Sequence, residues 1–145
     1  MRTVGRLMLG GFFIMSGISH FKKTKDLAGY AAAKGVPQPE VAVQVSGAMM
    51  LLGGTMLAIG LKPKFGALLI AGFLGGVSPV MHNFWAIEDP AQKMNDEINF
   101  MKNMALLGAA LAIAGAEEKI KEVKSEREKP RERSRARGLL RKKAA

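Results

Sequence analysis

The chain has no cysteine, one tryptophan and one tyrosine, and very little charge in four long stretches of its 145 residues. The lack of cysteine excludes disulfides, thiol catalysis, cysteine-ligated iron–sulfur clusters and haem attachment through C-x-x-C-H. Any redox role would therefore depend on a partner protein or on a cofactor held without a covalent bond. The length fits a single domain.

The four stretches with little charge are long enough to cross a membrane. They cover Val4–Phe21, Val41–Leu61, Phe65–Phe84 and Ile98–Ala116. At ~1.5 Å rise per residue, each forms a helix about 30 Å long, which is the thickness of the hydrocarbon core of a bilayer. The stretches are continuous and rich in Gly, Ala, Met and Leu, whereas membrane strands would alternate. The sequence therefore predicts an all-α polytopic membrane protein, an antiparallel four-transmembrane-helix bundle over residues 1–116.

Capping residues and short connections divide these stretches. Thr24 is predicted to N-cap a short interfacial helix that runs through Lys34. The connection at residues 62–64 is so short that the second and third spans must form an antiparallel hairpin. Asp89 is a good N-cap and Pro90 suits the first helical position, so the fourth helix is predicted to begin near Pro90, outside the membrane.

The ends of the chain carry most of the 22 lysine and arginine residues. Under the positive-inside rule, this distribution places both termini of a multi-pass cell-membrane protein in the cytoplasm. A cleaved signal peptide is the alternative for the first stretch, but no small-x-small cleavage pattern follows it at the right distance. Residues 117–145 are predicted to be a basic cytoplasmic tail, helical at first and disordered after Pro130. Anionic lipids would attract this tail, and nucleic acid is the weaker alternative because no aromatic residues are interleaved with the charges.

Small residues recur at four-residue spacing within three of the stretches. The pairs are Gly54 and Ala58, Gly72 and Gly76, and Gly108 and Ala112. Such pairs let helices approach closely in a membrane. They predict tight packing within one bundle, or a homo-oligomer formed through the same faces.

Polar side chains gather at one end of the predicted bundle, where the first and third helices end and the second and fourth begin. This outer cluster comprises His20, Gln44, His82, Asn83, Trp85, Asn99, Lys102 and Asn103. Polar groups in a membrane are costly unless they are paired, which makes the cluster a candidate binding site. The alternative is that these residues lie in the interfacial zone. Trp85 would then form an aromatic belt with Phe84 and Phe100. Asn99 and Asn103 would form hydrogen bonds between helices.

A quinone is the ligand that the outer cluster would suit best. His82 and Asn103 would donate to a quinone carbonyl, Lys102 would stabilise charge on it, and Trp85 would form a wall. The two histidines could also ligate a haem, but a single pair near the membrane rim is little evidence, and no third ligand is fixed for a metal ion. We expect no intrinsic cofactor, no metal site and no self-contained catalytic residues.

Several segments between Gly5 and Gly115 together resemble the DoxX family of small membrane proteins. They are Arg6-Leu7, Ser16-Gly17, Lys34-Gly35-Val36-Pro37, Leu51-Leu52-Gly53-Gly54, His82-Asn83-Phe84-Trp85 and Ile98–Gly108. The resemblance implies a four-helix membrane fold, and for some relatives a role as a subunit of thiosulfate:quinone oxidoreductase or of complexes that handle oxidative or thiol stress. Related sequences commonly carry a Lys where this chain has His20 and an acid where it has Met50, so a function that needs such a buried pair is not expected here.

Two hypotheses about function follow. The first is a quinone-contacting or anchoring subunit of a membrane oxidoreductase complex. The second is a non-enzymatic scaffold that recruits partners through the basic tail and the outer cluster. Transport of a small solute is a weaker third hypothesis, because no charged residue lies at the middle of a span.

Overall fold

The computed structural model describes residues 2–143, which are almost entirely helical. The elements in chain order are α1 (Arg2–Lys22), α2 (Thr24–Ala33), α3 (Pro39–Ile59), α4 (Pro63–Met81), the short 3₁₀ helix η1 (Phe84–Ala86) and α5 (Pro90–Lys143). Within this part of the chain, α1, α3, α4 and α5 each contain a segment long and apolar enough to cross a membrane. The predicted all-α fold with four spans is therefore confirmed.

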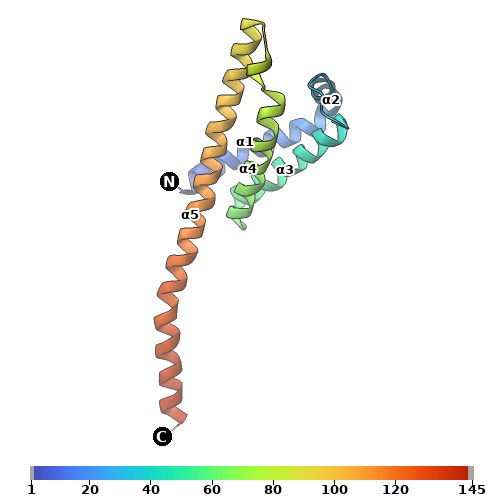
Figure 1. Ribbon diagram of the computed structural model, residues 1–145. Helices are drawn as coiled ribbons and strands as arrows, with labels where there is room; N and C mark the ends of the chain where they lie inside the picture. The colour runs from blue at the N-terminus through green and yellow to red at the C-terminus, as the bar shows by residue number, and fades with distance from the viewer. Residues whose placement is uncertain (1, 144–145) are drawn as a thin grey trace.

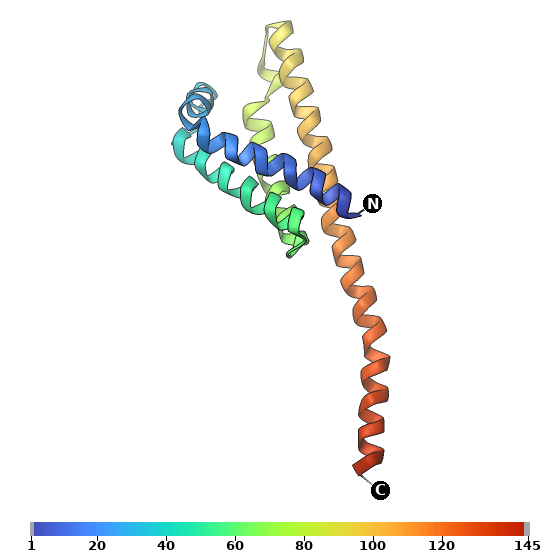
Figure 2. The ribbon, with the colours of Figure 1, turned by 180° about the vertical axis from the view of Figure 1, so that it is seen from behind.

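The helices are arranged as two antiparallel pairs. α1 lies beside α3, and α4 lies beside α5 (Figure 1). α3 also contacts α4, which joins the pairs, and in this view α1 and α3 run across the α4–α5 hairpin. Seen from behind, α1 passes α5 near its own N-terminus, and α5 continues well past the other helices (Figure 2). One end of α5 thus belongs to the bundle and the other end projects from it.

Adjacent glycines let α3 approach both of its neighbours. A Cβ atom on Gly54 would lie 2.7 Å from the Gly10 carbonyl oxygen of α1, and one on Gly53 would lie 2.9 Å from the Gly66 carbonyl oxygen of α4. A Cβ on Gly10 would lie 3.1 Å from the Cβ of Ala58. The predicted Gly54 and Ala58 pair is therefore used for packing, between α1 and α3 of the same chain.

The core where the pairs meet is small and apolar. Its fully buried side chains include Phe13 of α1, Met50 and Leu57 of α3, and Ile70 and Leu74 of α4. Ala110 and Ala114 bring α5 against them. Many large apolar side chains remain exposed on the outside of the helices, among them Met8, Met15, Leu52, Phe65 and Met101. Such a surface suits lipid, because acyl chains cover apolar side chains at no cost.

The helix boundaries differ from the sequence predictions in three places. Thr24 does not cap α2: its hydroxyl donates instead to the His20 carbonyl at 2.8 Å, because only Lys23 separates α1 from α2 and the carbonyls at the end of α1 need donors. α4 ends at Met81 rather than Phe84, two residues after Pro79, whose missing N–H weakens the helix there.

The third difference concerns the tail. The backbone of α5 continues as a helix through Pro130 to Lys143, where the sequence analysis expected a break followed by disorder. Proline removes one backbone hydrogen bond, and the bonds on either side of it are sufficient to keep the helical path. At ~1.5 Å per residue, this helix of 54 residues is about 80 Å long.

Candidate functional site

The residues of the outer cluster do not form one site, because they lie in different parts of the structure. His20 lines a cavity, whereas His82 and Asn83 belong to a network with Lys34 and Asp96. Trp85 packs against Phe84 and Phe100, and Gln44 is exposed on α3. On α5, Asn99 and Asn103 are half-buried and Lys102 is exposed. Within the described residues, no side-chain hydrogen bond links these three α5 residues to the rest of the cluster.

A polar network ties α2 to the tip of the α4–α5 hairpin. The Lys34 ammonium donates to Asp96 Oδ2 at 2.9 Å and to Asn83 Oδ1 at 3.2 Å. His82 Nδ1 lies 3.4 Å from the other carboxylate oxygen of Asp96. The Asp96 side chain is 4% exposed and that of Lys34 14%, so both charges are largely out of water. Because a buried charge is stable only with a partner, the network holds together as a unit.

The end of α2 and the start of α5 determine where Lys34 and Asp96 of the polar network lie. Lys34 is the C-cap of α2, and the next residue, Gly35, has a φ of 76°, which turns the chain away and leaves the lysine at the helix end. At the hairpin tip, Asp89 accepts a 2.7 Å hydrogen bond from the Gln92 N–H. This confirms the predicted cap, and it starts α5 early enough that Asp96 lies on a helix.

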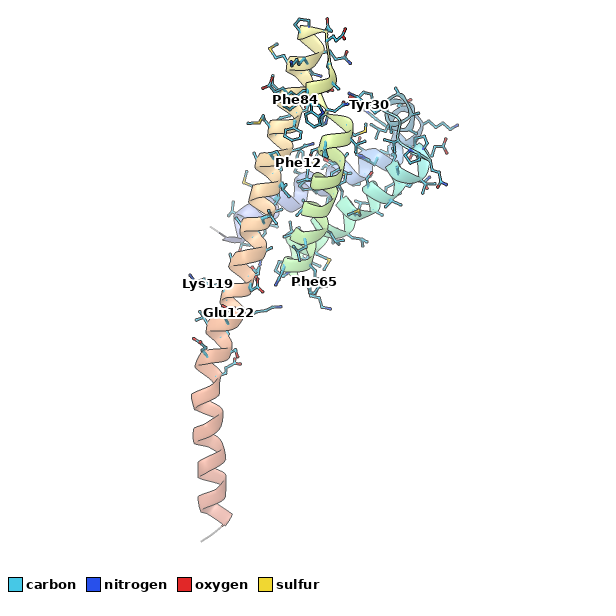
Figure 3. All side chains as sticks on the ribbon, in the orientation of Figure 1. Phe12, Tyr30, Phe65, Phe84, Lys119 and Glu122 are labelled. Atoms are coloured by element: carbon cyan, nitrogen blue, oxygen red, sulfur yellow. The ribbon has the colours of Figure 1, made fainter. Side chains whose placement is uncertain are left out.

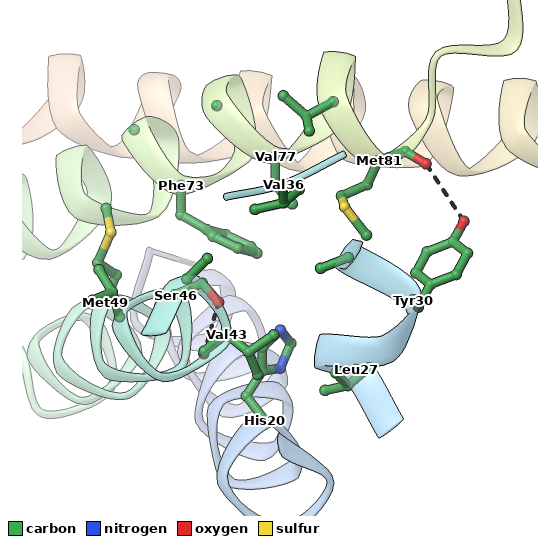
Figure 4. A pocket seen from close by; sticks show the side chains of 16 residues that line it. His20, Leu27, Tyr30, Val36, Val43, Ser46, Met49, Phe73, Val77 and Met81 are labelled. Atoms are coloured by element: carbon green, nitrogen blue, oxygen red, sulfur yellow. Dashed lines mark hydrogen bonds between the residues drawn. The ribbon is translucent and has the colours of Figure 1, made fainter. Parts of the chain in front are cut away.

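A cavity of about 400 Å³ lies between α4 on one side and α1, α2 and α3 on the other (Figure 4). Its walls are mostly apolar, with Phe73, Val77 and Met81 from α4 facing Val43 and Met49 from α3. This volume is within the usual range for sites that bind small molecules. The cavity lies at the end of the bundle where the sequence placed the outer cluster.

Two glycines of α4 help to create this space. Gly72 and Gly76 line the cavity, and a Cβ on Gly76 would meet no atom within 4 Å. The same holds for Gly108 on α5, which also faces open space. The predicted Gly72 and Gly76 pair therefore opens a cavity instead of bringing two helices of this chain into contact.

Three polar side chains reach the cavity, and each is hydrogen-bonded to backbone. His20 Nδ1 lies 2.9 Å from the Ser16 carbonyl oxygen, one turn earlier on α1. The Ser46 hydroxyl donates to the Val43 carbonyl at 2.9 Å. The Tyr30 hydroxyl donates across the cavity mouth to the Met81 carbonyl at 3.5 Å, drawn as a dashed line in Figure 4.

Three aromatic side chains pack together near the tip of the α4–α5 hairpin. The rings of Phe84, Trp85 and Phe100 meet pairwise at 5.2 to 5.9 Å between centroids, edge to face. Such contacts add about 0.5–1.5 kcal/mol beyond burial. The three residues predicted as an aromatic belt thus lie together, and they fix η1 against α5.

Ion pairs join the helices at the opposite end of the bundle. Arg6 Nη1 lies 3.5 Å from Glu117 Oε1, beside a second cavity of about 190 Å³, and Lys64 Nζ lies 2.7 Å from Glu118 Oε1. Figure 3 shows Lys119 and Glu122 just beyond, on the part of α5 that extends past the other helices. The start of α1, the start of α4 and the middle of α5 therefore lie at one level, as four alternating spans require.

The titratable side chains that the structure describes do not meet the needs of a metal site. Among residues 3–126 and 128, no three His, Asp or Glu side chains come together as ligands of one ion. The two histidines have different surroundings, since His20 borders the cavity and His82 contacts Asp96.

Sequence reasoning missed Lys34, Asp96 and Tyr30 as site residues. A signal for Asp96 was present: once Asp89 starts the helix, Asp96, Asn99 and Asn103 follow at i, i+3 and i+7 on one face. No comparable signal existed for Tyr30, because its place depends on how α2 packs against α4.

The DoxX family matches residues 1–83, from α1 to the residue before η1. This match covers the cavity walls and Lys34, while the Ile98–Gly108 segment that also resembled the family lies outside it. No curated protein and no solved structure matches the chain. Since the matched segment is more than half of the chain, the protein belongs to the DoxX family.

Proposed function

We propose that this protein is a membrane subunit that binds a quinone-type ring in the cavity between α4 and helices α1 to α3, and that it serves a redox complex in the cell membrane. The observation that carries the proposal is the cavity itself. It has about 400 Å³ of space, apolar walls and a few polar atoms, which is the composition of a site for a lipophilic ring.

The position of the cavity supports a ligand that arrives from the bilayer. It lies beside spanning helices whose outer surfaces are apolar, and α2 forms one of its walls through Leu27, Tyr30 and Ala31. A quinone-type ring could enter the cavity from the bilayer while its hydrocarbon tail stays among the lipids. Electron transfer would need a partner subunit, because a chain without cysteine holds no thiolate-bound cluster.

Two leucine substitutions on α4 test the proposal. Gly76→Leu would place a side chain in the cavity from a position whose Cβ meets no protein atom within 4 Å. Gly75→Leu adds the same side chain at the preceding residue, whose Cβ also has open space but which lies outside the cavity lining. We expect Gly76→Leu to weaken binding of menadione to the protein in nanodiscs by about tenfold or more, and Gly75→Leu to leave it unchanged. Equal affinities for both variants, or no binding to the unmodified protein, would contradict the proposal.

The projecting end of α5 favours a second function, recruitment of partners as a scaffold. The tail contains most of the basic residues, and its helical backbone carries them away from the bundle. Deleting residues 127–145 leaves the Arg6–Glu117 and Lys64–Glu118 pairs intact. We expect this deletion to release co-purifying proteins while the bundle stays folded; a truncated protein that retains all of them contradicts the scaffold role.

A further inference from the structure

The polar side chains around the cavity share one property that bears on which ligand fits. Each has directed its proton at a backbone carbonyl, and a carbonyl can only accept a hydrogen bond. These side chains can therefore offer a ligand in the cavity only the lone pairs that remain on their nitrogen and oxygen atoms.

His20 gives the clearest case. Its Nδ1 is 2.9 Å from the Ser16 carbonyl oxygen, so Nδ1 must carry the proton. A neutral imidazole has only one N–H, which leaves Nε2 as a lone-pair acceptor. Among the described residues, Nε2 has no hydrogen-bond partner in the protein, although the ring borders the cavity.

Ser46 and Tyr30 are in the same situation. The Ser46 hydroxyl donates to Val43 at 2.9 Å, and the Tyr30 hydroxyl donates to Met81 at 3.5 Å. Both oxygens keep their lone pairs. To donate to a ligand, either hydroxyl would first have to give up its bond to the backbone, which costs part of what the new bond would gain.

The geometry points to a cavity that selects a ligand able to donate a hydrogen bond, namely the hydroxyl-bearing, reduced form of an aromatic lipophile (a quinol or phenol) over the oxidised form that has only carbonyl groups. This inference rests on the proposed function, since it concerns the same cavity. The sequence predicted a hydrogen-bond donor, His82, for a quinone carbonyl, whereas the histidine that lines the cavity is His20, and its free nitrogen accepts. A quinone carbonyl would meet lone pairs at His20, Ser46 and Tyr30, whereas a quinol hydroxyl would find His20 Nε2 ready to accept.

A pair of redox-inert probes separates ring binding from hydrogen-bond donation. Naphthol carries a hydroxyl donor, and methoxynaphthalene has the same ring with the donor removed. Both are titrated calorimetrically into the unmodified protein in nanodiscs at pH 8, with empty nanodiscs as the blank. We expect naphthol to bind about fivefold to tenfold more tightly, the value of one net hydrogen bond to an otherwise unpaired acceptor.

The variant His20→Phe tests whether His20 Nε2 causes the preference for naphthol. His20→Phe keeps an aromatic ring of similar size and removes Nε2, so we expect the preference for naphthol to fall to about twofold or less while methoxynaphthalene binds as before. Circular dichroism confirms that the variant is folded.

The possible results distinguish the binding function of the cavity from its preference for a ligand that donates a hydrogen bond. Equal affinities for the two probes on the unmodified protein, or tighter binding of methoxynaphthalene, would overturn the donor preference and leave the cavity function standing. A full preference retained in folded His20→Phe would overturn the assignment to His20. Absence of binding by both probes would overturn the proposed function together with the inference.

Discussion

The pair of Lys34 and Asp96 should be strongly coupled, and a double-mutant cycle measures that coupling. The two side chains are 14% and 4% exposed and 2.9 Å apart. Removing one partner of a buried ion pair typically costs about 3–5 kcal/mol, because the other charge is left without compensation. Lys34 would keep its 3.2 Å bond to Asn83, and Asp96 would keep its 3.4 Å contact with His82. We therefore expect each single variant to cost about 3 kcal/mol, the lower end of that range.

The double variant should cost less than the sum of the singles, because Lys34→Met with Asp96→Leu removes both charges and leaves apolar groups in their place. Asn83 and His82 also lose a partner, so the exchange is not neutral. We expect the double variant to cost about 3–4 kcal/mol instead of about 6, a coupling energy of about 2–3 kcal/mol. The assay is unfolding by dodecyl sulfate in mixed micelles, followed by circular dichroism for the four proteins of the cycle.

Glu97 supplies the matched control. It is the next residue on α5 but is exposed, so Glu97→Ala should change stability by less than about 0.5 kcal/mol. If Lys34→Met and Asp96→Leu were additive within about 0.5 kcal/mol, the pair would not act as a unit and the reasoning about the polar network would be refuted.

Two further predictions concern packing and capping. Gly54→Ala would place a methyl 2.7 Å from the Gly10 carbonyl oxygen, so we expect a loss of about 1–3 kcal/mol in the same unfolding assay, whereas Gly11→Ala, with no atom within 4 Å, should cause no loss; equal effects would contradict the close α1–α3 contact. Asp89→Ala removes the 2.7 Å bond to the Gln92 N–H and should cost about 1 kcal/mol, seen as faster amide exchange confined to the first turn of α5; unchanged exchange there would show that the cap contributes nothing.

The spans could be predicted from the sequence because membrane thickness and local chemistry determine them. Each predicted stretch lies largely within its helix, and Asp89 caps α5 as its position before Pro90 indicated. The hairpin between α3 and α4 forms at residues 60–62, since Gly60 and Lys62 both have positive φ and Pro63 begins the next helix. These features depend on a few neighbouring residues.

The site could be predicted only as a region. Topology correctly brings the end of α1, the start of α3 and the end of α4 to one cavity, with His20 among its lining residues. It could not show that Gly72 and Gly76 open space instead of packing, because both uses have the same spacing. Nor could it pair Lys34 with Asp96, which lie 62 residues apart in the chain and meet only through the packing of α2.

The acidic residues of α5 have a further consequence for the choice of lipid. Asp96 is bound to Lys34 at one end of the bundle, and Glu117 and Glu118 are bound to Arg6 and Lys64 at the other. The intervening helix rises by about 31 Å at ~1.5 Å per residue, close to the ~30 Å of an average hydrocarbon core. These ion pairs therefore fix the hydrophobic length of the bundle. Thinner or thicker bilayers would create a mismatch that α5 cannot relieve by sliding, so the protein should be most stable in lipids of intermediate chain length.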